Sequence, residues 1–238
     1  MPTPVDRFWY LKRIKVFQEL DEAALERVAA KLGQAEYRKR QTIFTAYDPS
    51  DRIYLLRRGR VKLYMLSEDG REITLAILEE GDLFGETVLV NPASRQVFAE
   101  ALDDALVATM TRRDFLDLMR DHPDVALRVM AAIGERLMRT QQQVERLAFD
   151  DVSTRLARFL WDEVARSPAP AGGVIRLPLA LTHQEMANLL GTTRETLTAT
   201  LNRFIDDGVV AVESRGVLLV TDEAALRTRA RAASDRQR

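Results

Sequence analysis

The sequence of 238 residues predicts an α+β protein, with an N-terminal antiparallel β-roll, a long helix and a C-terminal winged helix-turn-helix. Three observations predict this fold. Glycines recur at eleven-residue intervals between short β-prone segments, a helical stretch has heptad spacing, and two short helices with capping threonines lie on either side of one glycine. The expected divisions are 1–110 for the roll, 111–149 for a linker and the long helix, 150–223 for the winged helix-turn-helix and 224–238 for an Arg/Ala-rich tail.

The first part of the chain has the pattern of short strands joined by tight turns. An amphipathic helix is predicted from Asp21 to Leu32, and after Gly33 the apolar period changes to that of strands. The run Glu68-Asp-Gly70 is typical of a hairpin, because glycine accepts the positive φ that such turns require. The predicted strands and the glycines that separate them are 52–56, Gly59, 61–66, Gly70, 72–78 and Gly81.

The middle of the chain predicts two helices. A short helix is expected at Arg112 to Met119, and Pro123 suits the first turn of a second helix that runs to about Phe149. Apolar residues and one threonine on the second helix alternate in spacing between three and four, which is a heptad seam. This seam favours a contact between two copies of the chain, and packing on the helix's own domain is the alternative. The seam residues are Met130, Ile133, Leu137, Thr140, Val144 and Leu147.

The segment from Thr182 to Val220 predicts the winged helix-turn-helix. It follows a further helix that ends near Val164 and a loop over 167–173. Thr182 and Glu185, like Thr192 and Glu195, have the spacing of a capping box at the start of a short helix. The strands of the wing are expected at 209–213 and 217–220, on either side of Ser214-Arg-Gly216.

The two short helices are expected to pack closely. Gly191 permits the sharp turn between them, and Ala187 is small enough for close contact. Their shared core is expected to contain Met186, Leu189, Leu190, Leu197, Leu201 and Phe204.

A helix-turn-helix places the first residues of its second helix in the major groove of DNA. Arg194 is suited to a bidentate contact with guanine, and Glu195 can accept a hydrogen bond from cytosine. The alternative for Glu195 is that it only completes the capping box. At the start of the first helix, side chains and backbone N–H groups suit phosphate. The expected DNA-binding residues are Thr182, His183, Gln184, Thr192, Thr193, Arg194, Glu195 and Thr198.

The composition excludes several classes of site. The absence of cysteine excludes disulfides, thiolate nucleophiles, iron–sulfur clusters and cysteine-bound zinc, and His122 and His183 are too far apart in sequence to suggest a metal site. The sequence contains neither a nucleophile–histidine pairing nor a phosphate-binding glycine loop, so it does not indicate an enzyme. A net charge of -1 means that DNA would be bound by a local patch. Since no signal peptide or membrane span is apparent, a cytoplasmic protein is expected.

The run Leu190-Gly-Thr-Thr-Arg-Glu-Thr-Leu197, which follows a β-roll and a seam helix ending in Leu147-Ala-Phe149, resembles the cyclic-AMP-receptor and fumarate-nitrate-reductase-regulator superfamily. The resemblance implies a homodimer that binds a two-fold symmetric DNA site and recruits or blocks RNA polymerase. Arg194 and Glu195 match the arginine and glutamate with which the family contacts bases. Ala199 stands where the cyclic-AMP-receptor branch has a second such arginine, so one base contact is missing.

The same resemblance implies an effector pocket for cyclic AMP. Gly85 would offer backbone N–H groups, Glu86 would accept from a ribose hydroxyl, Arg95 would pair with the cyclic phosphate, and Thr140 would contact the purine. Gln96 replaces the family's serine or threonine, and Gln141 replaces its seam serine. The haem-sensing and iron–sulfur-sensing branches are set aside, because the required Cys and suitably placed His are absent.

Other readings remain open at this point. Gly85 could be a turn glycine, Glu86 a helix cap and Arg95 a surface arginine, in which case the chain would be an effector-independent regulator of the same superfamily. A third hypothesis is a cyclic-nucleotide sensor that acts on a protein partner and uses the winged helix as a docking surface.

Overall fold

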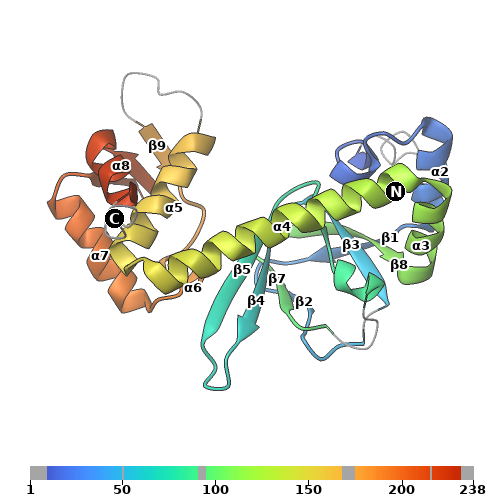
Figure 1. The fold of residues 1–238 in the computed structure, drawn as a ribbon, viewed down its shortest axis with the longest axis horizontal. Coiled ribbons are helices and arrows are strands. Elements are labelled where there is room, and N and C mark those ends of the chain that lie inside the picture. Colours follow the sequence, from blue (N-terminus) through green and yellow to red (C-terminus); the bar gives the residue numbers. More distant parts are fainter. Residues whose placement is uncertain (1–9, 50, 91–94, 168–174, 215, 232–238) are drawn as a thin grey trace. The chain divides into compact units, whose positions relative to one another are not determined.

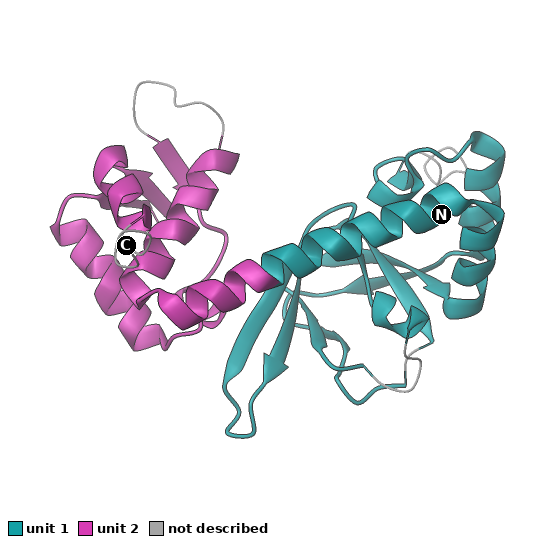
Figure 2. Cartoon of the chain, viewed as in Figure 1, with its two compact units in different colours: residues 1–140 teal, residues 141–238 magenta. Residues whose placement is uncertain are grey.

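The structure, a computed structural model, describes residues 10–49, 51–90, 95–167, 175–214 and 216–231 (Figure 1). The expected loop at 167–173, apart from Ser167, lies outside the described residues, as do Arg215 of the wing and 232–238 of the tail. The chain divides into two compact units, residues 1–140 and 141–238 (Figure 2). The line between them falls within the long helix, before the Phe149 boundary suggested by the sequence.

The first unit contains the antiparallel β-roll that the sequence predicts. One sheet has the strand order β1-β8-β3-β6 and the other has the order β2-β7-β4-β5, and every paired neighbour is antiparallel. The strands are β1 (Gly33–Tyr37), β2 (Thr42–Phe44), β3 (Arg52–Arg58), β4 (Val61–Leu66), β5 (Glu72–Leu78), β6 (Leu83–Phe84), β7 (Phe98–Ala101) and β8 (Ala105–Thr111).

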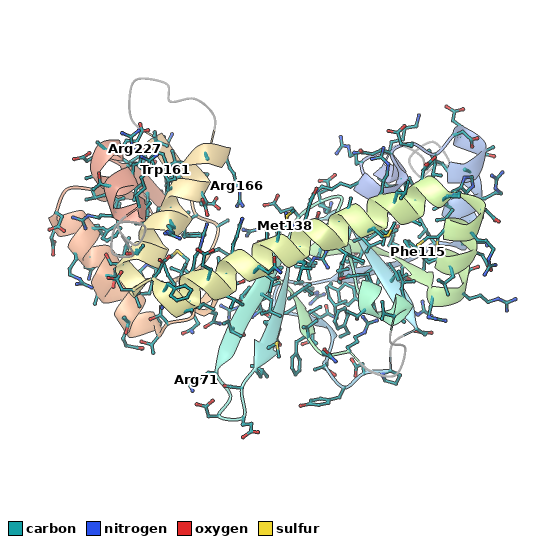
Figure 3. The ribbon with its side chains drawn as sticks, in the orientation of Figure 1. Arg71, Phe115, Met138, Trp161, Arg166 and Arg227 are labelled. Carbon is teal, nitrogen blue, oxygen red and sulfur yellow. The ribbon has the colours of Figure 1, made fainter. Side chains whose placement is uncertain are left out.

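The glycines predicted to join these strands do so. Gly59, Gly70 and Gly81 have φ values of 86°, 79° and 92°, in a backbone region that residues other than glycine rarely adopt. The β4–β5 hairpin closes at Gly70, whose N–H donates to the Ser67 carbonyl, and Arg71 lies at its tip (Figure 3). The two sheets share a core that includes Phe44, Leu56, Leu63, Phe84 and Val107.

The helices of the first unit pack on the roll through a second apolar cluster. Asp21 caps α2 by accepting from the Ala24 N–H at 2.7 Å, and the buried Phe115 of α3 joins this cluster (Figure 3). Pro123 is the first residue of the long helix, as its fixed φ favours. The helices are η1 (Lys15–Phe17), α2 (Glu22–Lys31), η2 (Glu86–Leu89), α3 (Arg112–Asp121) and α4 (Pro123–Phe149), the last of which continues into the second unit.

The second unit is a winged helix-turn-helix. A three-stranded sheet of order β10-β11-β9 contains the predicted wing, and β9 was not predicted from sequence. Its remaining elements are α5 (Val152–Arg166), β9 (Ile175–Pro178), α6 (His183–Leu189), α7 (Arg194–Asp206), β10 (Val210–Ser214), β11 (Val217–Val220) and α8 (Glu223–Arg231).

The Arg/Ala-rich segment expected as a tail over 224–238 begins as part of a helix. Residues 223–231 form α8, which packs on α5. Leu226 and Ala230, one turn apart, are buried in the core of the unit, and Arg158 of α5 donates to the Ala230 carbonyl at 2.9 Å. The Ala/Arg composition concealed this apolar pair. No helix among the described ranges is both long and apolar enough to cross a bilayer.

Candidate nucleic-acid interface and effector pocket

The start of α6 is fixed by the predicted capping box. The Thr182 hydroxyl accepts from the Glu185 N–H at 3.2 Å, and the Glu185 carboxylate accepts from the Thr182 N–H at 2.6 Å. Each residue thus satisfies a backbone or side-chain group of the other, so the first turn of α6 is held from both sides.

The second predicted capping box, Thr192 with Glu195, is wrong. The N-cap of α7 is Thr193, which has an extended backbone and accepts from the Thr196 N–H at 3.2 Å. Thr192 belongs instead to the turn, where its N–H donates to the Ala187 carbonyl at 3.0 Å. The preceding residue, Gly191, has a φ of 60°. The turn therefore ends one residue later than the sequence pattern suggested.

This shift changes the interpretation of Glu195. It is the second residue of α7, not the third, so its carboxylate does not complete a cap. Within the described residues the Glu195 carboxylate makes no hydrogen bond or ion pair. The side chains of Glu195 and the adjacent Arg194 are both exposed. The alternative in which Glu195 serves only the cap is excluded, and both side chains are available to a ligand.

The two helices pack as expected, with one exception. Ala187 is fully buried between them, and the other predicted core side chains are buried except Leu189. Leu189 is partly exposed, and its carbonyl accepts a hydrogen bond from Gln143 of α4 at 3.3 Å. This packing holds the first turn of α7 at the surface of the unit.

The structure brings most of the predicted DNA-binding residues to the surface of α6 and α7. Thr182, His183 and Gln184 are exposed at the start of α6, and His183 Nδ1 lies 3.1 Å from Thr198 Oγ1 on α7. Thr192 and Thr198 are the half-buried members of the set. The exposed members are a local source of donors and charge in a chain of net charge -1.

In the first unit, Gly85 and Arg95 lie together inside the roll. Arg95 is only 3% exposed, so the surface-arginine reading is wrong. Its guanidinium stacks 3.9 Å from the centre of the Phe44 ring, and Nη2 donates to the Arg52 carbonyl at 3.0 Å. Gly85 has a φ of 75°, and a Cβ there would lie 2.8 Å from Arg95 Nη1. Glycine is required both by the backbone and by the arginine beside it.

Burial perturbs the charged group in this pocket. Desolvation lowers the pKa of the Arg95 guanidinium, and the nearby Tyr54 opposes that shift. Arg95 also lies over the Tyr54 ring at 5.1 Å, so an aromatic face stabilises the cation. The carboxylates of Asp48, Asp51 and Glu86 likewise oppose the lowering of its pKa. A buried cation of this kind favours an anionic ligand.

Glu86 has a partner that the sequence pattern does not predict. Arg136 of α4 donates to the Glu86 carboxylate at 2.8 Å and also to the Leu83 carbonyl. Glu86 is therefore not merely a cap of η2. No spacing in the sequence connects the two residues. The Arg136 carbonyl also accepts from the Thr140 hydroxyl at 2.9 Å, one helical turn later on α4.

Three buried polar atoms in this region lack a hydrogen-bond partner among the described residues. They are Arg95 Nη1, Glu86 Oε2 and Arg136 Nε. Buried polar atoms are nearly always paired, so three unpaired atoms of complementary kinds indicate a place for a polar ligand. Gln96 lies on an exposed bend, and Gln141 is exposed on α4 just beyond the first unit.

Two family models match the chain. The model of the cyclic nucleotide-binding domain matches residues 34–122, and that of the Crp-like helix-turn-helix domain matches residues 154–229. The matches therefore cover the β-roll and the winged helix-turn-helix separately.

Similar proteins span nearly the whole chain. A CRP-like cAMP-activated global transcriptional regulator of Mycobacterium tuberculosis is 30% identical over 93% of this chain and 98% of its own. The structure of a CooA mutant from Carboxydothermus hydrogenoformans has a TM-score of 0.76 at 27% identity, over 90% of this chain and 93% of that one. The c-di-GMP responsive regulator CLP of Xanthomonas campestris has a TM-score of 0.74 at 26% identity, over 85% of this chain and 100% of its own.

Proposed function

Because the chain belongs to the CRP-like family of DNA-binding transcription regulators, we propose that it acts as a homodimer on a two-fold symmetric DNA site under the control of cyclic AMP. The chain is a transcription regulator and not an enzyme.

Arg194 and Glu195 are the proposed base-contacting pair. The observation that supports this is their exposure, without internal partners, on the first turn of a helix whose start is fixed by Thr193. Arginine pairs best with guanine, and glutamate accepts from cytosine. Thr182, His183, Gln184, Thr192, Thr193 and Thr198 are proposed to contact the backbone or neighbouring bases.

The DNA site can be found by selecting bound duplexes from a randomised library and then measuring affinity at fixed salt. Arg194→Ala is expected to weaken binding by about 1–3 kcal/mol and to relax the preference at one base position in each half-site. A matched control is Arg166→Ala, which removes an arginine of α5 paired with Glu163. Affinity that Arg194→Ala leaves unchanged would instead favour a sensor that acts on a protein partner.

The proposed effector site is the buried group around Arg95. Its unpartnered Nη1 supports a contact with the cyclic phosphate, and the unpartnered Oε2 of Glu86 supports a contact with the ribose hydroxyl. Thr140, on the same helix as Arg136, is proposed to contact the purine. Gln96 and Gln141, exposed in this structure, would have to approach the ligand to take part.

Calorimetry on the full chain tests the effector. Cyclic AMP is expected to bind at one site per protomer, and Arg95→Gln is expected to abolish the heat of binding while circular dichroism shows the fold retained. Cyclic di-GMP serves as a second ligand, because a similar regulator is described as responsive to it. If neither nucleotide binds the wild-type chain, the effector-independent regulator is the better reading.

The proposed dimer contact is the seam of α4. Met130, Ile133 and Leu137 are 59%, 38% and 57% exposed, although each is apolar. Met138, beside the seam, is 56% exposed (Figure 3). Exposed apolar side chains at heptad spacing are suited to a second copy of the same helix. RNA polymerase is the proposed partner on DNA, and the cytoplasm, where that DNA lies, is the proposed site of action.

A further inference from the structure

His183 and Thr198 form a hydrogen bond between the two helices of the DNA-binding motif. His183 Nδ1 lies 3.1 Å from the Thr198 hydroxyl oxygen. The same oxygen lies 2.8 Å from the carbonyl oxygen of Arg194, one turn earlier on α7. Thr198 therefore has one hydroxyl proton and two neighbours that could receive it.

The geometry decides where that proton is. Two oxygen atoms 2.8 Å apart repel unless a proton lies between them, so the Thr198 hydroxyl donates to the Arg194 carbonyl. The lone pairs of the hydroxyl oxygen then face His183, and Nδ1 must supply the hydrogen of the 3.1 Å contact. A neutral imidazole has only one N–H, so neutral His183 has a bare Nε2 that can only accept.

A bare Nε2 is unsuited to the DNA backbone. Phosphate oxygens are acceptors, and the lone pair of a neutral Nε2 would face lone pairs on the phosphate. Nε2 makes no hydrogen bond within the described part of the chain, and the ring is exposed on the same helix pair as Arg194. Protonation turns Nε2 into a charged donor while it leaves the Nδ1–H contact with Thr198 intact.

We propose that His183 takes up a proton when DNA binds, so that Nε2–H donates to a phosphate oxygen while Thr198 holds Nδ1–H. This inference rests on the DNA-binding function proposed above. It makes affinity for DNA depend on pH in a range where histidine ordinarily changes charge, between about pH 5 and 8. Affinity is highest at low pH and decreases as pH rises and His183 loses its proton.

Other ionisable groups on the two helices do not predict the same dependence. They are Glu185 on α6, and Arg194, Glu195, Arg203 and Asp206 on α7. Carboxylates and guanidiniums ordinarily change charge outside the range of pH 6 to 8.5. The chain has no cysteine and one further histidine, His122, in the first unit.

The experiment measures affinity for a selected duplex between pH 6 and 8.5 at constant ionic strength. The dissociation constant of the wild-type chain is expected to rise with pH, by at most about tenfold per pH unit for each protomer, since one proton is linked to each. His183→Gln is expected to flatten this dependence, and His122→Gln is expected to leave it unchanged.

Thr198→Val separates the proposed arrangement from a simple charge effect. Without the hydroxyl, neutral His183 is free to carry its hydrogen on Nε2 and to donate to phosphate without taking up a proton. The pH dependence is therefore expected to shrink in Thr198→Val and to persist in Thr198→Ser, whatever the absolute affinity of either variant.

The outcomes are distinguishable. If the wild-type chain binds its selected duplex with the same affinity across the pH range, or if His183→Gln keeps the full slope, proton uptake at His183 is wrong and the DNA-binding function stands. A full slope in Thr198→Val overturns the role of Thr198. If no duplex is selected at any pH, the proposed function itself fails.

Discussion

Thr192 and Thr193 are adjacent, yet only Thr193 caps a helix. Its hydroxyl accepts from the Thr196 N–H, whereas Thr192 contributes its backbone N–H to the turn. Thr193→Ala is expected to lower the free energy of unfolding by about 1 kcal/mol, because one N–H of the first turn loses its acceptor. Thr192→Ala is expected to change it by less than about 0.5 kcal/mol.

Urea denaturation of the full chain, followed through the DNA-binding unit, measures both values. Equal losses in the two variants would show that the assignment of the cap is wrong. A loss in Thr192→Ala alone would restore the capping box that the sequence pattern suggested.

Gly85 and Gly70 provide a matched pair at the same scale. Both have positive φ, at 75° and 79°, but a Cβ at Gly85 would meet Arg95 and Tyr54, whereas a Cβ at Gly70 would meet nothing within 4 Å. Both alanine variants are therefore expected to lose about 1–2 kcal/mol of stability to backbone strain. Only Gly85→Ala is expected to weaken cyclic AMP binding, by more than about tenfold, because Arg95 is displaced.

Calorimetry with cyclic AMP, together with thermal unfolding, separates the two effects. Unaltered affinity in Gly85→Ala would contradict the placement of the ligand beside Arg95. Weakened affinity in Gly70→Ala would show that strain in the roll alone accounts for the loss.

At the scale of the element, α4 has an apolar stripe that the described chain does not cover. Leu137→Glu is expected to convert the dimer into a monomer, because the carboxylates of two copies would face each other in an apolar contact. Gln142→Glu introduces the same charge on an exposed position away from the stripe and is expected to leave the dimer intact. Sedimentation velocity distinguishes the two states, and a dimeric Leu137→Glu would place the interface elsewhere.

Elements with a local cause were predictable from the sequence. The turns at Gly59, Gly70 and Gly81 have positive φ, and glycine is the residue that adopts it most readily, so these turns could be predicted. The cap at Thr182 is a contact between residues only three positions apart. The start of α7 was predicted one residue early, since two adjacent threonines offer the same oxygen. The choice between them depends on the contact between Thr192 and Ala187, which only the packed turn supplies.

Contacts between residues far apart in the sequence could not be predicted from local patterns. Arg136 pairs with Glu86 across fifty positions of sequence, and no spacing rule connects two separate elements. Helix α8 is stabilised by packing against a core to which α5 contributes. The local sequence of an Ala/Arg-rich segment does not reveal that core. The helix-turn-helix motif was enough to predict which site residues lie on α6 and α7. The burial of Arg95 could not be predicted in this way, because it depends on the packing of the whole roll.

For the whole molecule, effector control requires that the two ligands influence each other's affinity. Saturating cyclic AMP is expected to raise affinity for DNA by about 5–150-fold, and DNA must then raise affinity for cyclic AMP by the same factor. Arg95→Gln is expected to abolish both effects while basal DNA binding remains measurable. Affinity for DNA that is equal with and without cyclic AMP would contradict effector control.

Arg136 and Leu137 are neighbours on one continuous helix, yet they face different surroundings. Arg136 is bound to Glu86 and to the Leu83 carbonyl in the roll, whereas Leu137 is exposed on the apolar stripe. A hydrogen-bonded helix turns as a rigid rod over so short a distance. A ligand that turns this part of α4 by displacing the guanidinium would therefore turn Leu137 through the same angle, and binding inside the roll would change the orientation of an exposed side chain on the stripe.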